Sequence, residues 1–144
     1  MGFDGARAPF VRSPAHRRRP DAIGVAIGFN DAQARRIFAG SDFTLMPSRF
    51  EPCGLSQMYA QRFGSLPIGH QTGGLAETIT DGETGFLFPQ PSAESFLGGV
   101  RRAFSAFMST ERLNAMRLSA MARSFSWDLS AACYNALYQR TIVP

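Results

Sequence analysis

Short apolar runs alternate along this chain with longer stretches in which apolar positions recur every three or four residues. The runs cover residues 23–27, 43–46, 66–68 and 86–88, and each has the length of a buried strand. The stretches between them have the spacing of helices that bury one face. Strands that alternate with helices predict an α/β fold, with a Rossmann-like parallel sheet flanked by helices on both faces.

The first two helices are predicted from their apolar faces and their end signals. Asn30 or Asp31 is suited to cap a helix that ends at Gly40. A second helix opens at Leu55, where apolar residues recur at helical spacing, and Gly64 ends it. Its buried face is predicted to consist of the following residues: Leu55, Met58, Tyr59, Arg62 and Phe63.

The chain after residue 91 is predicted to be helical. One helix carries an apolar stripe from Phe96 to Phe107, a second covers about residues 111–123, and a third opens near Ser126. The stripe of the first of these helices, and Cys133 in the last, are expected to lie in the core.

Two glycine-bearing turns each join a predicted strand to a predicted helix. The first contains Glu51 and Gly54, and the second contains Gly73 and Gly74. A helix start offers unpaired N–H groups to an anion, and open parallel sheets bind ligands at the carboxyl ends of their strands. The pattern alone is also consistent with ordinary strand-to-helix turns and a surface glutamate, so the residues leave both interpretations open.

Composition places the chain among globular proteins. It has 144 residues, of which 44% are apolar, enough for a domain with a core. No run is apolar enough to span a bilayer, and no secretory signal is visible. Cys53 and Cys133 do not have the spacing of a metal site or a disulfide framework. We therefore expect a cytoplasmic protein without membrane partners.

Much of the net charge of +4 lies at the start of the chain. Residues 1–21 contain five arginines and three prolines but few apolar residues, so we expect a disordered basic tail there and a folded domain over residues 22–144. Nucleic acid is a conceivable partner for such a tail. A solvated tail is the favoured interpretation, because no RNA-binding motif follows.

Several segments together resemble bacterial glycogen synthase and plant starch synthase. They are residues 48–55 (Ser-Arg-Phe-Glu-Pro-Cys-Gly-Leu), 64–67 (Gly-Ser-Leu-Pro), 72–78 (Thr-Gly-Gly-Leu-Ala-Glu-Thr), 24–30 and 125–127. They agree with the family in order and spacing from about residue 23 to residue 138. Residues 1–21 take no part in the resemblance.

The resemblance implies the GT-B arrangement, in which two Rossmann-like domains face each other across a cleft. It implies transfer of glucose from ADP-glucose to the non-reducing end of an α-1,4-glucan with retention, with ADP-glucose as substrate and no cofactor or metal. Only the later part of the C-terminal, nucleotide-sugar-binding domain is matched. We therefore expect a truncated domain that is inactive alone and that self-associates through an exposed sheet edge.

The resemblance also assigns roles in the first turn. Glu51 corresponds to the acidic catalytic residue that contacts the donor glucose, and Cys53 and Gly54 line the sugar pocket. Leu55 and Ser56 offer backbone N–H groups to the distal phosphate. Cys53 could equally be a small buried residue, as free cysteines often are.

The second turn and one upstream aromatic residue complete the implied site. Thr72, Gly73 and Gly74 lie near the nucleotide and its phosphates, and Phe29 falls where the family places an aromatic ring against adenine. Without the resemblance, Phe29 would be read as a core residue. Residues 70–71 depart from the family, which usually has basic or larger residues there, so the charge of this loop is reduced.

The sequence is compatible with three functions. The chain is either a piece of a glycogen or starch synthase, a non-catalytic module that binds a nucleotide-sugar or glucan, or a fold remnant that binds nothing. Titration with ADP-glucose separates the last two.

Overall fold

The computed structural model describes residues 14–142 of the chain. The chain divides between Ala34 and Arg35 into two units, and each is described here by itself. Most of the predicted basic tail, residues 1–13, lies outside the described residues. The tail boundary after residue 21 stays a prediction.

Within residues 14–34 the structure contains a short helix and the start of a second one, but no strand. Helix α1 covers Pro14–Arg18, where the sequence predicted no regular element, and it buries none of its residues. Residues 23–27 were predicted to form the first strand, and this prediction is wrong, because they form no regular element. An extended segment needs a neighbouring strand to accept and donate its backbone hydrogen bonds. In the described chain no strand lies beside residues 23–27 to do so.

Helix α2 covers Asp31–Gly40 and ends at the predicted glycine. The Asn30 side chain accepts a hydrogen bond from the Gln33 N–H group at 2.9 Å, which is the predicted N-cap. The predicted apolar face is not buried, since no residue of α2 is buried.

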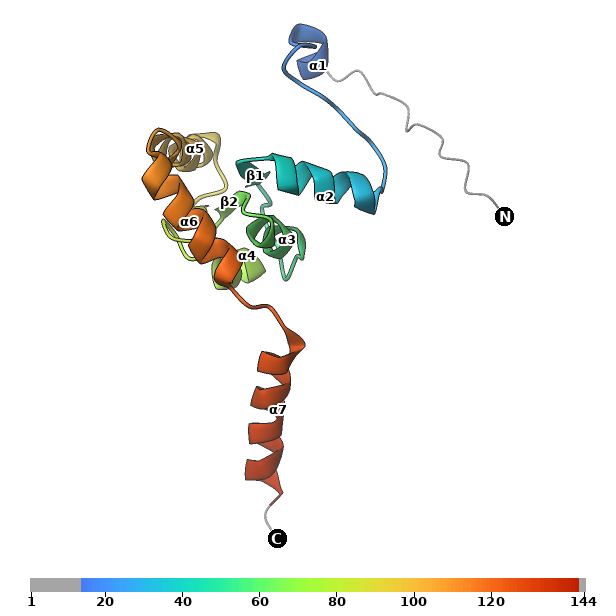
Figure 1. Cartoon of the computed structure of the whole chain (residues 1–144), viewed down its shortest axis with the longest axis vertical. Helices are drawn as coiled ribbons and strands as arrows, with labels where there is room; N and C mark the ends of the chain where they lie inside the picture. Colours follow the sequence, from blue (N-terminus) through green and yellow to red (C-terminus); the bar gives the residue numbers. More distant parts are fainter. Residues whose placement is uncertain (1–13, 143–144) are drawn as a thin grey trace, which may run out of the picture. The chain divides into compact units, whose positions relative to one another are not determined.

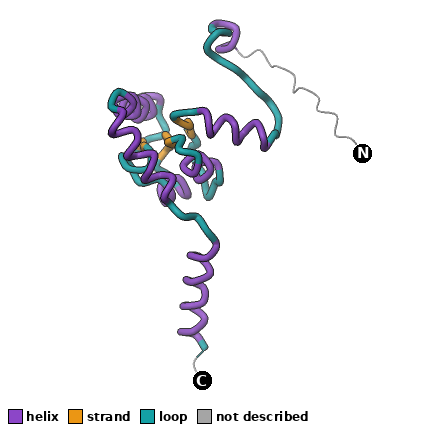
Figure 2. The backbone as a smooth tube through the Cα atoms, viewed as in Figure 1, coloured by secondary structure: helices purple, strands orange, loops and turns teal. Residues whose placement is uncertain are grey.

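The sheet contains three parallel strands in the order β1-β2-β3 within the described residues. Figure 2 draws strands in orange, among the purple helices that surround them. The strands are β1 (Phe43–Met46), β2 (Leu66–His70) and β3 (Phe86–Phe88). Phe43 pairs with Leu66, and Ile68 pairs with Phe86. Pro67 lies in the central strand opposite Thr44, one residue before the pairing with β3 begins, so its missing N–H group is tolerated there.

Helices cover both faces of the sheet, which confirms the predicted fold class. Helices α5 (Ala93–Phe107) and α6 (Thr110–Ala122) pack on one face (Figure 1). Their core contains the following residues: Leu66, Ile68, Phe86, Phe88, Ala103, Ala106, Leu113, Met116 and Ala120. Helix α4 (Gly73–Thr78) lies on the other face, where Leu75 and Ile79 pack with Leu87. The alternation of side chains along each strand separates the two cores.

Helix α3 covers Ser56–Arg62, as predicted, but it buries the opposite face. Its buried residues are Gln57, Ala60 and Gln61, whereas the side chains of Leu55 and Tyr59 are more than half exposed. The predicted buried face is therefore wrong. Residues at helical spacing lie on both faces of α3, so spacing alone does not show which face is buried. The face with Gln57 and Gln61 is buried because both side-chain amides form hydrogen bonds within the protein.

The C-terminal helices follow the predicted ranges but bury less than predicted. On α5, Leu97, Phe104 and Phe107 of the stripe are substantially exposed. Helix α7 (Trp127–Thr141) begins at the predicted position, where the Ser126 hydroxyl accepts a hydrogen bond from the Asp128 N–H group at 3.1 Å. None of its residues is buried, so the expectation that Cys133 lies in the core is wrong.

Candidate functional site

The Glu51 turn leaves the carboxyl end of β1 and enters α3, as the sequence predicted. Its sharp bend places Gly54 at a φ of +71°, a conformation that favours glycine. The Glu51 side chain is half-buried, and the Ser48 hydroxyl donates to its Oε2 atom at 3.4 Å. The carboxylate thus lies beside the turn and is held by one weak hydrogen bond.

The structure brings the two glycine turns together. The Gly74 N–H group donates to the Glu51 carbonyl at 2.9 Å. A Cβ atom on residue 73 would lie 2.2 Å from the Glu51 carbonyl oxygen, and one on residue 74 would lie 2.2 Å from the Cys53 carbonyl oxygen. Both positions therefore require glycine, because any side chain would collide with the backbone of the Glu51 turn.

The first turn keeps its backbone donors free. In the described part of the chain, the N–H groups of Gly54, Leu55 and Ser56 donate to no protein group. Gly54 has a positive φ and Leu55 follows in a right-handed helical conformation. Successive N–H groups in such a pair form a concave nest that suits anions.

The second turn offers fewer donors than the sequence suggested. The Gly74 N–H group is already bonded to Glu51, and the Thr72 N–H group donates to the His70 carbonyl at 2.8 Å. The Gly73 N–H group has no acceptor among residues 14–142. Gly74 thus contributes close backbone packing rather than a free donor, and Gly73 is the residue of this turn with an available N–H group.

The remaining predicted site residues are exposed. Cys53 has a free, exposed thiol, which argues against the alternative that it is a small buried residue. Phe29 is 98% exposed and therefore is not a core residue. It belongs to the unit before Arg35, which is described separately from the Glu51 turn.

Buried polar side chains behind the two turns escaped the sequence analysis. The Gln57 Nε2 atom donates to the Cys53 and Gly54 carbonyls, both at 2.9 Å, and to the Thr78 hydroxyl at 3.2 Å. The Gln61 Nε2 atom donates to the Thr78 carbonyl at 3.0 Å. The sequence feature that could have indicated them is the pair of glutamines four residues apart, since residues at this spacing lie on the same face of a helix.

His70 supports the start of the Glu51 turn. Its ring is buried and stacks on Phe88 with the ring centroids 5.6 Å apart. Its Nδ1 atom donates to the Ser48 carbonyl at 3.1 Å, since a carbonyl oxygen only accepts. The histidine therefore anchors the loop that carries Glu51.

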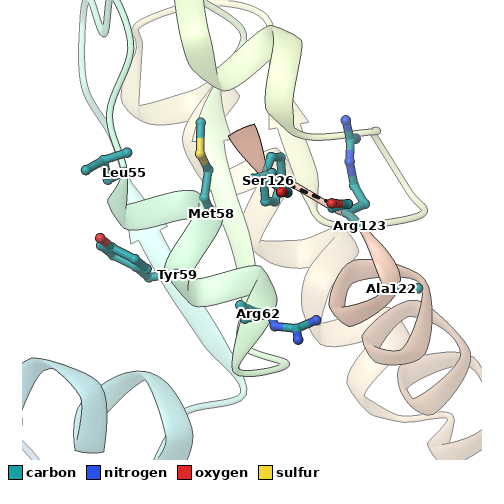
Figure 3. Close-up of a pocket in the computed structure, with 9 residues that line it drawn as sticks. Leu55, Met58, Tyr59, Arg62, Ala122, Arg123 and Ser126 are labelled. Atoms are coloured by element: carbon teal, nitrogen blue, oxygen red, sulfur yellow. Dashed lines mark hydrogen bonds between the residues drawn. The ribbon is translucent and has the colours of Figure 1, made fainter. Parts of the chain in front are cut away.

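A cavity of about 450 Å³ adjoins the exposed face of α3 (Figure 3). Met58, Tyr59 and Arg62 line it from α3 together with Leu55, the residue before that helix. Opposite them lies the segment 122–126, which runs from the last residue of α6 to the start of α7. The cavity shares Leu55 with the first turn but does not include Glu51. Glu51 therefore lies outside this cavity. The capacity of its turn to bind a ligand depends on the Glu51 carboxylate and on the free backbone N–H groups of the turn.

Residues 14–142 contain neither a cluster of metal ligands nor a helix that could span a membrane. Their His, Cys, Asp and Glu side chains form no group of three that could hold a metal ion. None of the helices there has both the length and the apolar character needed to cross a bilayer.

Comparison with known proteins identifies the class to which this fold and site belong. Residues 16–117 match the family "Glycosyl transferases group 1", and the chain belongs to that family.

Similar proteins include glycogen and starch synthases. The chain is 85% identical over 126 residues to Glycogen synthase 1 of Bradyrhizobium diazoefficiens, which covers 88% of this chain and 27% of that protein. It is 60% identical over 122 residues to glycogen synthase of Pseudomonas syringae pv. tomato, covering 85% and 25% of the two chains. The chain thus spans about a quarter of the length of these relatives.

A solved structure supports the fold. The catalytic domain of starch synthase IV from Arabidopsis thaliana, bound to ADP and acarbose, matches with a TM-score of 0.78 and 33% identity. The match covers 88% of this chain and 28% of that one. The resemblance noted in the sequence is therefore confirmed at the level of family and fold.

Proposed function

We propose that this chain forms the donor-binding part of a retaining glucosyltransferase that transfers glucose from ADP-glucose to the non-reducing end of an α-1,4-glucan, in glycogen biosynthesis. The observation that carries the proposal is the junction of the two glycine turns, in which the Gly74 N–H group bonds the Glu51 carbonyl at 2.9 Å. The high identity to a glycogen synthase and the solved relative bound to ADP and acarbose support the choice of ligands.

The turn offers complementary groups for a sugar diphosphate. The free N–H groups of Gly54, Leu55 and Ser56 suit the distal phosphate, because unpaired donors stabilise negative charge. Glu51 lies on the same turn, where its carboxylate can orient a glucose hydroxyl and stabilise an oxocarbenium-like transition state. Cys53 and Gly54 complete the sugar side of the proposed site.

The nucleotide end of the site rests on fewer groups. The Gly73 N–H group and the Thr72 side chain lie in the adjoining turn. For Phe29, which has an exposed ring and belongs to the separate unit before Arg35, we propose stacking on adenine from the resemblance to glycogen synthases alone. Binding by the chain alone is expected to be weak, because the two turns supply backbone donors and no pair of charged side chains to clamp a pyrophosphate.

Titration calorimetry of the purified chain with ADP tests the binding step, with ADP-glucose and UDP as comparison ligands. We expect ADP to bind more tightly than UDP and to protect the amides of residues 54–56 from exchange. Transfer is tested in a full-length synthase that carries this segment, by following labelled glucose into glycogen. Absence of ADP binding in both proteins would contradict the proposal.

The alternative function is a non-catalytic module that holds a nucleotide-sugar or glucan. It is favoured by one observation, that Glu51 does not line the cavity beside α3, whereas the free N–H groups of the first turn can hold an anion without a catalytic group. ADP binding by the chain, together with an unaltered transfer rate when Glu51 is replaced in the full-length synthase, would support this alternative.

A further inference from the structure

Gln57 is an amide with no exposed surface, and it contacts both glycine turns at once. Its side chain is 0% exposed. Its Nε2 atom shares its two hydrogens among three acceptors, which are the carbonyls of Cys53 and Gly54 and the hydroxyl of Thr78. Thr78 in turn donates its hydroxyl hydrogen to the Gly74 carbonyl. One amide therefore links the Glu51 turn to the second turn.

These bonds determine the direction of the free donors. In a trans peptide unit the carbonyl and the N–H group point in opposite directions. Gln57 holds the Cys53 carbonyl on the buried side, so the Gly54 N–H group faces away from the core. The Gly54 carbonyl is held in the same way, so the Leu55 N–H group faces away as well. Neither N–H group has an acceptor in the described part of the chain.

The arrangement leaves one buried polar atom unsatisfied. Gln57 Oε1 has no hydrogen-bond partner among residues 14–142. The atom points toward the turn, since a Cβ on residue 54 would lie 2.8 Å from it and 3.2 Å from the Glu51 carboxyl carbon. A buried acceptor without a donor costs free energy, and here that cost accompanies the bonds from Nε2 to the two carbonyls of the turn. An apolar side chain of equal length would remove the unsatisfied Oε1 atom but would leave both carbonyls without this donor.

We propose that Gln57 is a positioning residue that turns the Cys53 and Gly54 carbonyls inward and thereby aims the Gly54 and Leu55 N–H groups at an anionic ligand. The orientation of the amides follows from the geometry of the protein. The identity of the anion, the distal phosphate of ADP-glucose, rests on the proposed function.

Gln61 provides a matched control. It lies one turn further along α3, is also 0% exposed, and also has a buried Oε1 atom without a partner. Its Nε2 atom bonds the carbonyls of Gln57 and Thr78 but neither carbonyl of the Glu51 turn. Methionine at either position removes the amide and keeps the length of the side chain, so the two variants differ in their contact with the turn.

The test compares Gln57→Met, Gln61→Met and the unaltered chain by NMR on isotope-labelled protein. Residual dipolar couplings report the direction of each N–H bond. We expect the couplings of Gly54 and Leu55 to change in Gln57→Met and to stay as in the unaltered chain in Gln61→Met, while both variants melt at similar temperatures. Titration with ADP, and with inorganic pyrophosphate as a probe of phosphate binding alone, should show an affinity lowered about tenfold in Gln57→Met only.

The outcomes separate this proposal from the proposed function. Unchanged couplings in Gln57→Met would overturn the positioning role, whatever the ligand does. Changed couplings in a chain that binds neither ADP nor pyrophosphate would support the positioning role and contradict the proposed ligand. If Gln57→Met does not fold, Gln57→Glu keeps the shape and replaces the donor with an acceptor. Its couplings at Gly54 and Leu55 must then change, and unchanged couplings would overturn the proposal.

Discussion

Glu51 is the single side chain on which the proposed chemistry depends most. It lies on the turn with the free N–H groups and forms one weak hydrogen bond, with Ser48 at 3.4 Å. Replacement by glutamine keeps the shape but removes the negative charge. In a full-length synthase, we expect Glu51→Gln to keep ADP affinity and to lower turnover at least about 100-fold, the scale of one charge-stabilising group. Glu83→Gln, in the exposed turn before β3, is the control, and equal turnover of the two variants would exclude the role.

Phe29 tests the nucleotide end of the site. Stacking of a base on an aromatic ring is worth about 1–3 kcal/mol, so Phe29→Ala should weaken ADP binding about 5- to 150-fold in the full-length synthase. The transferred sugar should stay the same, because the ring is proposed to contact adenine alone. Phe29→Tyr keeps the ring and should bind ADP like the unaltered enzyme. Calorimetry that finds equal affinity for the alanine variant would argue against stacking.

At the scale of elements, the junction between the two turns is also a structural constraint. A Cβ on residue 74 would lie 2.2 Å from the Cys53 carbonyl oxygen, whereas one on Gly98 in α5 would meet nothing within 4 Å. We expect Gly74→Ala to lower the free energy of unfolding by at least about 2 kcal/mol, because backbone must move to admit the methyl group. Gly98→Ala should raise it by about 0.5–1 kcal/mol, since alanine favours a helix.

Urea denaturation of the purified chain, followed by circular dichroism, compares these two variants directly. Equal stability of both would mean that the two turns are not in contact in solution. A loss confined to Gly74→Ala would confirm the contact on which the proposed site is built.

The sequence predicted those elements whose signals are local. The ranges of β1, β3 and α7 follow from apolar runs and caps, and the two turns were recognised from their glycines. Residues 23–27 have the composition of a strand but form none, because a strand depends on a partner elsewhere and the composition does not show whether one is present. The buried face of α3 was missed for a similar reason. The hydrogens of Gln57 and Gln61 are accepted partly by nearby carbonyls and partly by Thr78, which is 21 and 17 residues away, and the sequence does not show that Thr78 lies beside them.

For the whole molecule, the proposed reaction requires more than the described site. Holding donor and acceptor together supplies about 7–11 kcal/mol of a transfer barrier. The chain covers 27% of a related glycogen synthase, and Glu51 does not line the cavity beside α3. We therefore expect the chain alone not to elongate glycogen. Incubation with labelled ADP-glucose and glycogen checks this, with the Glu51→Gln chain as background, and label above that background would refute it.

The sheet leaves β1 at one edge in the described residues, and the Leu45 side chain there is 56% exposed. Such an edge offers unpaired backbone groups to another chain. Self-association through the sheet edge stays a prediction.

The exposure of α7 has a consequence for how this protein can be observed. Trp127 is the only tryptophan in the sequence, and it is 84% exposed at the start of a helix without buried residues. We therefore expect its fluorescence emission to resemble that of indole in water, and melting of the sheet and its two cores to leave the spectrum almost unchanged. We expect the same ring to shift to shorter wavelength when another surface covers α7. This chain thus carries an intrinsic optical probe that is silent to unfolding and sensitive to docking.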